Sequence, residues 1–340
     1  MKKYMIFGIA AMLILATGCT VPASFEKNKK SEVSFLAMDT YMKLTAYGSY
    51  DDELQKAQDY ILDLEKKLST TDKDSEVSRL NKDKKLANAS KPTVELIAES
   101  IEAYEKTDKS FDFALYPVSK LWGFTTGKYK VSSQNEIEEL LPHTTPSNSS
   151  IQISGESISL TDEKMELDLG GIAKGYAADK VMEQLTEAGC TSAVISLGNN
   201  IQTLGLKPDG SKWNIGIMHP SDENKQLGSV LVKDAAVVTS GGYERYFEQD
   251  NHHYCHIIDP ATGVPVENGL SSVTIISKSG KEADVLSTAL FVMGKEKAIE
   301  FWQKGQYDFD FVMFTESGEL YISEGIATEF KSELSYQIIK

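Results

Sequence analysis

The stretch that decides the fold is Glu166–Asp179, with the sequence ELDLGGIAKGYAAD. Its first residues have the alternation typical of a strand end, and the apolar spacing of Ile172–Glu187 predicts a helix. Gly170 and Gly171 allow a tight turn and a close approach of the backbone to a ligand. Because free amides and the dipole at a helix start favour an anion, we expect a phosphate to bind here.

Two charged residues of this stretch bear on that expectation. Lys174 falls in the first turn of the predicted helix, where the dipole disfavours a cation unless an anion joins it. Asp168 precedes the glycines, and two interpretations stay open for it. It either contacts a ligand or only caps the helix.

A second predicted helix, Glu282–Met293, carries oxygen ligands on an apolar background. Asp284, Ser287 and Thr288 lie on one face, and no other charge follows before Gly294. A buried carboxylate is costly unless it is paired or binds a metal, and carboxylate and hydroxyl oxygens suit Mg²⁺. The alternative is that Asp284 caps the helix and Thr288 bonds back to a carbonyl.

A third candidate is His256, which starts the run HIIDPATG and falls in a predicted strand, Tyr254–Asp259. The sequence DPATG, which follows, is a strong turn signal. A single histidine in a strand is more often a packed core residue than a functional one. Its occurrence together with the two helices favours a site for phosphoryl chemistry on a nucleotide.

The remaining pattern predicts an α+β fold in which mixed sheets pack against helices. Amphipathic helices are expected at Asp51–Leu68 and Thr93–Thr107, and a hairpin at Ile151–Leu160. Strands flank a turn inside Val33–Tyr47. Strands outnumber helices without regular alternation, which argues against a doubly wound sheet. We expect residues 32–340 to form a single compact catalytic unit.

The N-terminus predicts a lipid-anchored protein on the extracytoplasmic face of the cell membrane. A basic start and the apolar run Met5–Leu15 are too short to span a bilayer and indicate a signal peptide at residues 1–18. The residues before Cys19 resemble a bacterial lipobox, so Cys19 is the expected lipidation site, and residues 19–31 the tether. The alternative is ordinary secretion with a free cysteine.

The formal charge of −15 disfavours nucleic acid and anionic lipid as partners. An anionic ligand must therefore be held by local groups. Cys190 and Cys255 are too few for a disulfide framework, and we expect both to be unpaired core residues. The lack of CxxC, HExxH, GxSxG and Walker-type sequences excludes zinc ribbons, zincins, α/β-hydrolases and P-loop NTPases.

These runs, taken in order, resemble the FAD:protein FMN transferases, the ApbE family of flavin-handling lipoproteins with a T-fold-related architecture. The resemblance covers Val33 to the C-terminal strands. It rests on MDTYMKL, LSTTDKDSEVSRLN, SFDFALYPVSKLWGF, LDLGGIAKGYAADKV, SLGNN, TSGGYERYF, HIIDPATGVP and ADVLSTALFVMG. It departs from the family pattern at Asp39, where a glycine is usual, and at Gly198–Asn200, where Gly-Gly-Asn is usual.

The resemblance implies transfer of FMN from FAD onto a threonine hydroxyl of an acceptor protein, with Mg²⁺ as cofactor and AMP as product. It implies metal binding by the Gly171 carbonyl, Asp284 and Thr288. It implies catalytic functions for His256, Asp284 and Lys174, the general base being open between His256 and Asp284. Contacts to FAD are implied for Met38, Thr71, Ser110, Phe111, Asp112, Asp168, Lys174 and Ile258. The implied acceptor is an extracytoplasmic electron-transfer protein.

Two other functions fit the same residues. A Mg²⁺-dependent FAD pyrophosphatase would use the same metal site with water in place of threonine. A flavin-binding lipoprotein without chemistry would hold FAD unchanged, although such proteins usually have two regularly alternating α/β lobes.

Overall fold

The computed structural model describes residues 29–340. The expected signal peptide, Cys19 and residues 19–28 of the expected tether lie outside the described residues. The first strand begins at Lys30, just before the expected domain boundary at residue 32. Within the described part of the chain, no helix combines the length and the apolar character needed to cross a bilayer.

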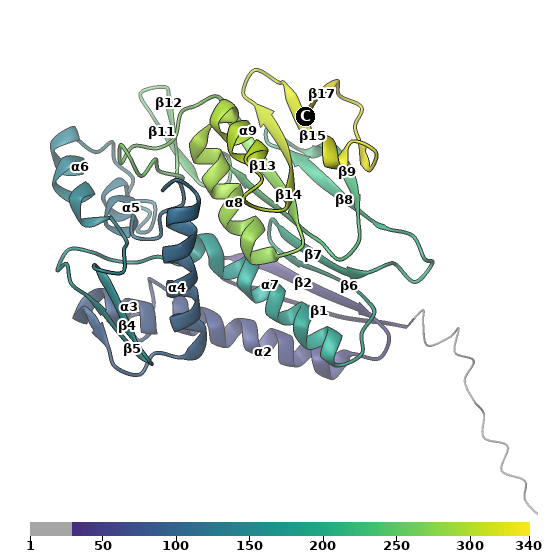
Figure 1. Ribbon diagram of the computed structural model, residues 1–340, viewed down its shortest axis with the longest axis horizontal. Helices are drawn as coiled ribbons and strands as arrows, with labels where there is room; N and C mark the ends of the chain where they lie inside the picture. Colours follow the sequence, from purple (N-terminus) through teal and green to yellow (C-terminus); the bar gives the residue numbers. More distant parts are fainter. Residues whose placement is uncertain (1–28) are drawn as a thin grey trace, which may run out of the picture.

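A nine-stranded sheet forms the centre of the molecule (Figure 1). In spatial order its strands are β1 (Lys30–Ala37), β2 (Thr40–Tyr47), β6 (Ser192–Leu197), β7 (Asn200–Gly205), β10 (Ala236–Gly241), β13 (Leu270–Ser277), β14 (Phe309–Thr315), β15 (Leu320–Ser323) and β17 (Tyr336–Ile339). Neighbouring strands are antiparallel except for β15 and β17. A largely antiparallel sheet covered by helices is an α+β fold, which confirms the expected class.

Helices cover one face of this sheet and bury the main hydrophobic core (Figure 1). They are α2 (Asp51–Leu68), α4 (Lys91–Lys106), α7 (Gly170–Glu187), α8 (Gly280–Met293) and α9 (Lys295–Gln303). Close to them lie α3 (Glu76–Asp83) and a small sheet of β3 (Lys85–Leu86), β5 (Ser157–Leu160) and β4 (Ile151–Ser154). Of these helices, α7 and α8 make the most extensive contact with each other.

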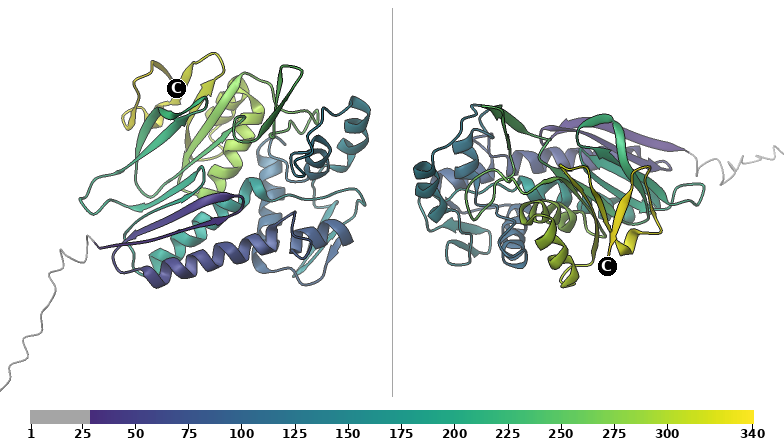
Figure 2. Two further views of the ribbon diagram at one scale, coloured as in Figure 1. Left: turned by 180° about the vertical axis from the view of Figure 1, so that it is seen from behind. Right: turned by 90° about the horizontal axis from the view of Figure 1, so that it is seen from above.

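The opposite face of the sheet is covered by a second, smaller sheet. It contains β16 (Phe330–Lys331), β9 (Asp222–Val232) and β8 (Trp213–His219), and encloses a separate apolar core. Seen from behind, β1, β2, β8 and β9 lie in front of the helices (Figure 2). A third apolar cluster joins α5 (Tyr116–Trp122) and α6 (Gln134–Leu140) to the hairpin of β11 (Tyr246–Gln249) and β12 (His252–Cys255).

The helix predicted from the apolar spacing at Asp51–Leu68 has the same bounds in the structure. Three other helices begin two residues earlier than predicted. α4 starts at Lys91 instead of Thr93, α7 at Gly170 instead of Ile172, and α8 at Gly280 instead of Glu282. In α7 and α8 the first helical turn contains glycines, which are poor helix formers in isolation. The α8 cap is Ser279, whose hydroxyl accepts from the Glu282 amide, so the alternative of Asp284 as that cap is wrong.

The segment that leads into α7 forms only an isolated bridge between Glu166 and Leu115 instead of the predicted strand end, and a side chain of α3 binds it. Asn81 is buried, and its Nδ2 donates to the Leu167 carbonyl at 2.8 Å. Its Oδ1 accepts from the Leu167 amide at 2.7 Å. Asn81 therefore satisfies both backbone groups of a buried residue close to the glycine start of α7.

We expect Asn81→Leu to destabilise the fold by about 1–3 kcal/mol, because two buried backbone groups would lose their partners. Urea denaturation followed by circular dichroism measures this loss. The matched control is the same substitution at exposed Asn148, which is expected to change little. Equal stability of the Asn81 variant and the wild type would contradict the importance of this contact.

Candidate functional site

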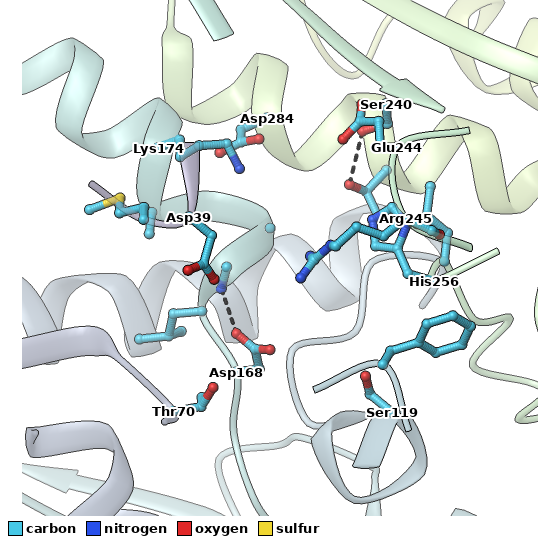
Figure 3. Close-up of a pocket in the computed structure, with 18 of the residues that line it drawn as sticks. Asp39, Thr70, Ser119, Asp168, Lys174, Ser240, Glu244, Arg245, His256 and Asp284 are labelled. Carbon is cyan, nitrogen blue, oxygen red and sulfur yellow. Dashed lines mark hydrogen bonds between the residues drawn. The ribbon is translucent and has the colours of Figure 1, made fainter. Parts of the chain in front are cut away.

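A cleft of about 770 Å³ opens where α7, α8 and the tip of the β1–β2 hairpin meet (Figure 3). Its other walls come from the loop after α2, residues 111–125, the end of β10 and residues 256–258. These segments are far apart in the sequence. The cleft therefore exists only when the sheet and both helices are assembled.

Most of the residues singled out from the sequence line this cleft. They are Met38, Thr71, Phe111, Asp112, Asp168, Gly171, Lys174, His256, Ile258, Asp284 and Thr288. Ser110 is the exception, because it does not line the cleft, and its contact with FAD stays a prediction. Its amide donates to the Thr107 carbonyl in the turn after α4, one residue before the chain enters the cleft wall at Phe111.

The expected metal ligands of the two helices lie together. Asp284 is buried in α8, and its Oδ2 accepts from the Gly175 amide of α7 at 2.9 Å. In a regular α-helix that amide is the partner of the Gly171 carbonyl. The carboxylate and the carbonyl are therefore neighbours of the same N–H group, and both Gly171 and Asp284 line the cleft.

Hydroxyl groups continue this side of the cleft. The Ser240 hydroxyl lies 2.8 Å from that of Ser287 and 3.4 Å from that of Thr288. The alternative for Thr288 was a hydrogen bond from its hydroxyl back to a carbonyl of the same helix. Such a bond is made by Ser287 instead, whose hydroxyl donates to the Asp284 carbonyl at 2.9 Å. Thr288 lines the cleft, and its hydroxyl contacts the Ser240 hydroxyl instead of a helix carbonyl.

Asp168 and Lys174, at the start of α7, both line the cleft. Asp168 Oδ1 accepts from the Gly170 amide at 2.8 Å, so Asp168 provides a partner for the first free amide of α7 and also lines the cleft. Burial raises the pKa of Asp168, while the Gly170 amide and the positive charges of Arg245 and Lys174 oppose this rise. Lys174 lies in the second helical turn, one turn later than expected, because α7 begins at Gly170.

His256 follows β12 directly instead of lying within a strand. Its Nδ1 lies 3.1 Å from the Arg245 carbonyl, which only accepts, so Nδ1 carries the proton. Burial, together with the charges of Arg245 and Lys174, lowers the pKa of His256 from 6.5 to about 3. The ring is therefore neutral at pH 7, and Nε2 is the atom that can accept a proton.

Residues 111–113 bring an aromatic ring and a carboxyl group into the cleft. A Cβ added to Gly171 would lie 3.0 Å from the Phe111 ring, so this glycine lets α7 approach the aromatic wall. Burial raises the pKa of Asp112 to about 8. The Ala114 amide, which donates to its Oδ1, opposes this rise. At pH 7 the protonated form of Asp112 dominates, and it can donate a hydrogen bond.

Several residues of the cleft wall have no function predicted from the sequence. Arg245 points into the cleft beside His256 (Figure 3), and Glu244 accepts from the Asn199 amide group at 2.9 Å. Arg245 is one of only two arginines in the chain, and that rarity was a usable signal. Glu244 and Asn199 belong to loops that are paired only in three dimensions, so nothing in the sequence pattern connected them.

The cleft wall carries more carboxyl groups than cationic groups. The carboxyl groups belong to Asp39, Glu65, Asp112, Asp168, Glu244 and Asp284, while the cations are Lys174 and Arg245. Such a wall repels a diphosphate unless a cation accompanies it. No cluster of three or more His, Cys, Asp or Glu side chains with metal-binding geometry occurs among residues 29–340. One carboxylate with hydroxyl and carbonyl oxygens instead fits Mg²⁺ that shares its ligands with a substrate phosphate.

The cleft thus combines a helix start, two cations, oxygen ligands and a neutral histidine, which is a set suited to phosphoryl transfer. Both remaining cysteines, Cys190 and Cys255, are free and buried as expected, and neither lines the cleft.

Comparison with known proteins leads to the same chemistry. An FAD:protein FMN transferase from Vibrio cholerae is 31% identical over 98% of this chain and 100% of its own length. One from Klebsiella pneumoniae is 36% identical over 74% of this chain and 78% of its own length.

Solved structures agree with the sequence comparison. The ApbE protein of Thermotoga maritima superposes with a TM-score of 0.82 at 29% identity, covering 89% of this chain and 100% of that one. The flavin transferase ApbE of Vibrio cholerae superposes with a TM-score of 0.77 at 28% identity, over 88% and 99% of the two chains. The ApbE family model matches residues 38–313. The chain therefore belongs to the ApbE family and is a flavin-transferring enzyme.

Proposed function

We propose that this enzyme transfers FMN from FAD onto a threonine hydroxyl of an acceptor protein, with Mg²⁺ as cofactor and release of AMP. The observation that supports this most directly is the junction of α7 and α8. It places Asp284 beside the partner amide of Gly171 in a cleft that also contains Lys174 and His256. The expected flavin-binding residues line the same cleft.

In this proposal the Gly171 carbonyl, Asp284 and Thr288 hold Mg²⁺, which when bound would neutralise charge on the diphosphate. Lys174 and Arg245 attract the phosphate oxygens, and the start of α7 favours their negative charge. Phe111, Met38 and Ile258 provide apolar surface for the flavin or adenine ring. Protonated Asp112 offers a hydrogen-bond donor where an ionised carboxylate would repel the substrate.

The proposed reaction forms one P–O bond and breaks another. The threonine oxygen attacks the phosphorus of the FMN half, the bond from that phosphorus to the bridging oxygen breaks, and AMP leaves with that oxygen. The threonine proton passes to Nε2 of His256 and then to solvent. The low pKa of His256 in the free enzyme limits its strength as a base, and the negative diphosphate raises this pKa when it binds beside the ring.

The location and the acceptor are further parts of the proposal. The N-terminal pattern supports a lipid anchor at Cys19 on the extracytoplasmic face of the membrane. An acceptor that reaches this enzyme must have its threonine on the same side. An extracytoplasmic electron-transfer protein fits this requirement.

Incubation of the protein with FAD, Mg²⁺ and a threonine-bearing acceptor tests the activity directly. We expect covalent FMN on the acceptor threonine by mass spectrometry and one AMP for each FMN transferred. A Thr→Ala acceptor is the matched control and stays unmodified. Free FMN plus AMP without modified acceptor would instead show a pyrophosphatase, and unchanged FAD in a stoichiometric complex would show a binding protein.

We expect Asp284→Asn to reduce Mg²⁺-dependent transfer by roughly 10³-fold, because the amide keeps the shape of the side chain but loses its charge. The rate of acceptor flavinylation at saturating FAD measures the effect. Asp310→Asn in β14 is the control, since Asp310 is a half-buried carboxyl that does not line the cleft. Near-wild-type flavinylation by the Asp284 variant would remove this residue from the metal site.

The low pKa of His256 predicts an unusual pH profile for kcat/KM. Loss of the neutral ring in the free enzyme is expected near pH 3, instead of near pH 6.5 for an ordinary histidine. A His256→Asn variant should be slower by ~10²–10⁴-fold at pH 7. Flavinylation rates between pH 4 and pH 8 measure the loss in the variant and should show no acid limb from His256 in the wild type. An acid limb near pH 6.5 that disappears in the variant would contradict the assignment.

The same shift affects stability with a defined sign. Because the folded pKa lies below the unfolded one, the neutral ring contributes its full stability above pH 6.5, and this contribution falls as the pH drops toward 3. The Tm of the wild type should therefore fall more than the Tm of His256→Asn as the pH is lowered from 6.5 toward 3.

A further inference from the structure

The two helices that carry the proposed metal ligands approach each other through glycines. A Cβ added to Gly175 of α7 would lie 2.2 Å from the Gly280 carbonyl, where α8 begins. A Cβ added to Gly280 would lie 2.9 Å from the Gly175 carbonyl. Neither position accepts a side chain without separating the helices, so the backbones are in direct contact there.

One carboxylate of α7 is bonded to the start of α8. Asp179 Oδ1 accepts from the Gly280 amide at 2.6 Å, and its Oδ2 accepts from the Lys281 amide at 3.1 Å. The Ser279 hydroxyl donates to Oδ2 at 2.9 Å. The Gln202 side chain on β7 donates to Oδ1 at 2.9 Å and fixes the carboxylate from the sheet side. Asp179 thus binds free amides at the N-terminus of α8, where the helix dipole favours a negative charge.

The contacts between the helices follow a regular spacing. The Asp179–Gly280 bond is the first, and the Gly175–Asp284 bond follows four residues further along each helix in opposite directions. Another step of four residues leads to Gly171 on α7 and Thr288 on α8, both of which line the cleft. Each step is about one turn, or ~6 Å along the axis. The bond at Asp179 and the proposed metal site are therefore two turns apart on the same pair of helices.

We propose that Asp179 is a positioning residue, which sets the register of α8 against α7 and thereby holds Asp284 and Thr288 opposite the Gly171 carbonyl. This inference rests on the proposed metal-dependent function. Asp179 does not line the cleft, so it acts on the ligands only through the helices. A metal that needs oxygens from both helices is more sensitive to a shift between them than the flavin, whose expected contacts come mostly from other segments.

Asp179→Asn is the variant that tests this function. An amide keeps one accepting oxygen but cannot accept from both the Ser279 hydroxyl and the two backbone amides, so α8 loses part of its anchor. Residues that orient metal ligands typically change metal affinity by about 10–100-fold when they are replaced. We expect that loss in binding of Mn²⁺, measured by electron paramagnetic resonance in the presence of ADP. The Mg²⁺ concentration for half-maximal flavinylation should rise by a similar factor.

Two readouts distinguish positioning from a general loss of structure. Binding of FAD at saturating Mg²⁺, measured by flavin fluorescence, should stay within about twofold of wild type, as should the flavinylation rate at that concentration. Asp310→Asn removes a carboxylate that accepts from the Ser323 hydroxyl at 2.6 Å outside the cleft, and its Mn²⁺ affinity should be unchanged. Ser279→Ala, which removes one donor to Asp179, should weaken Mn²⁺ binding less than Asp179→Asn does.

Wild-type Mn²⁺ affinity in folded Asp179→Asn would overturn the proposal, and so would an equal loss in Asp310→Asn. A parallel loss of FAD binding at saturating Mg²⁺ would also overturn it by showing general disorder. If the Asp179 variant does not fold, Ser279→Ala decides alone, and unchanged Mn²⁺ affinity in it counts against the proposal. Absence of metal-dependent transfer in the wild type would instead refute the proposed function, whatever the Mn²⁺ affinities of the variants.

Discussion

The hydrogen bond from the Gly175 amide to Asp284 is the contact on which the site depends. It joins residues separated by 109 positions in the sequence and places a buried carboxylate of α8 against the second turn of α7. The bond is possible because Gly175 has no side chain to keep the Gly280 backbone away. Without this close approach, the oxygens of the two helices would lie too far apart to share the proposed Mg²⁺.

The electrostatics of the cleft follow from the same arrangement. Six carboxyl groups and two cationic side chains line a space that must accept a diphosphate. Burial raises the pKa of Asp112 to about 8, so protonation of Asp112 removes part of this negative charge at pH 7. Burial also raises the pKa of Asp168. The remaining carboxylates disfavour an anionic substrate, and the proposed Mg²⁺ would offset their charge.

The sequence predicted elements whose own periodicity determines them, such as α2, with the same bounds as in the structure. It missed the starts of α7 and α8, because glycine is a poor helix former in isolation and is used here for contact between helices. Continuous motifs placed Asp168, Lys174 and Asp284 correctly in the cleft wall. The pairing of Asn199 with Glu244, and the support of His256 by the Arg245 carbonyl, depend on loop geometry that has no periodic signal.

The two sides of the cleft differ in how they are built. The α7–α8 side is fixed by helices and backbone contacts, which suits ligands that need sub-ångström placement. The opposite side includes the two-residue turn Met38–Asp39, where both residues have positive φ (48° and 58°). The Met38 amide donates to Glu65 at 2.6 Å, which holds this strained turn at the cleft mouth. Asp39 is exposed there, so the proposed acceptor protein would meet a negatively charged turn before its threonine reached the oxygens of α7 and α8.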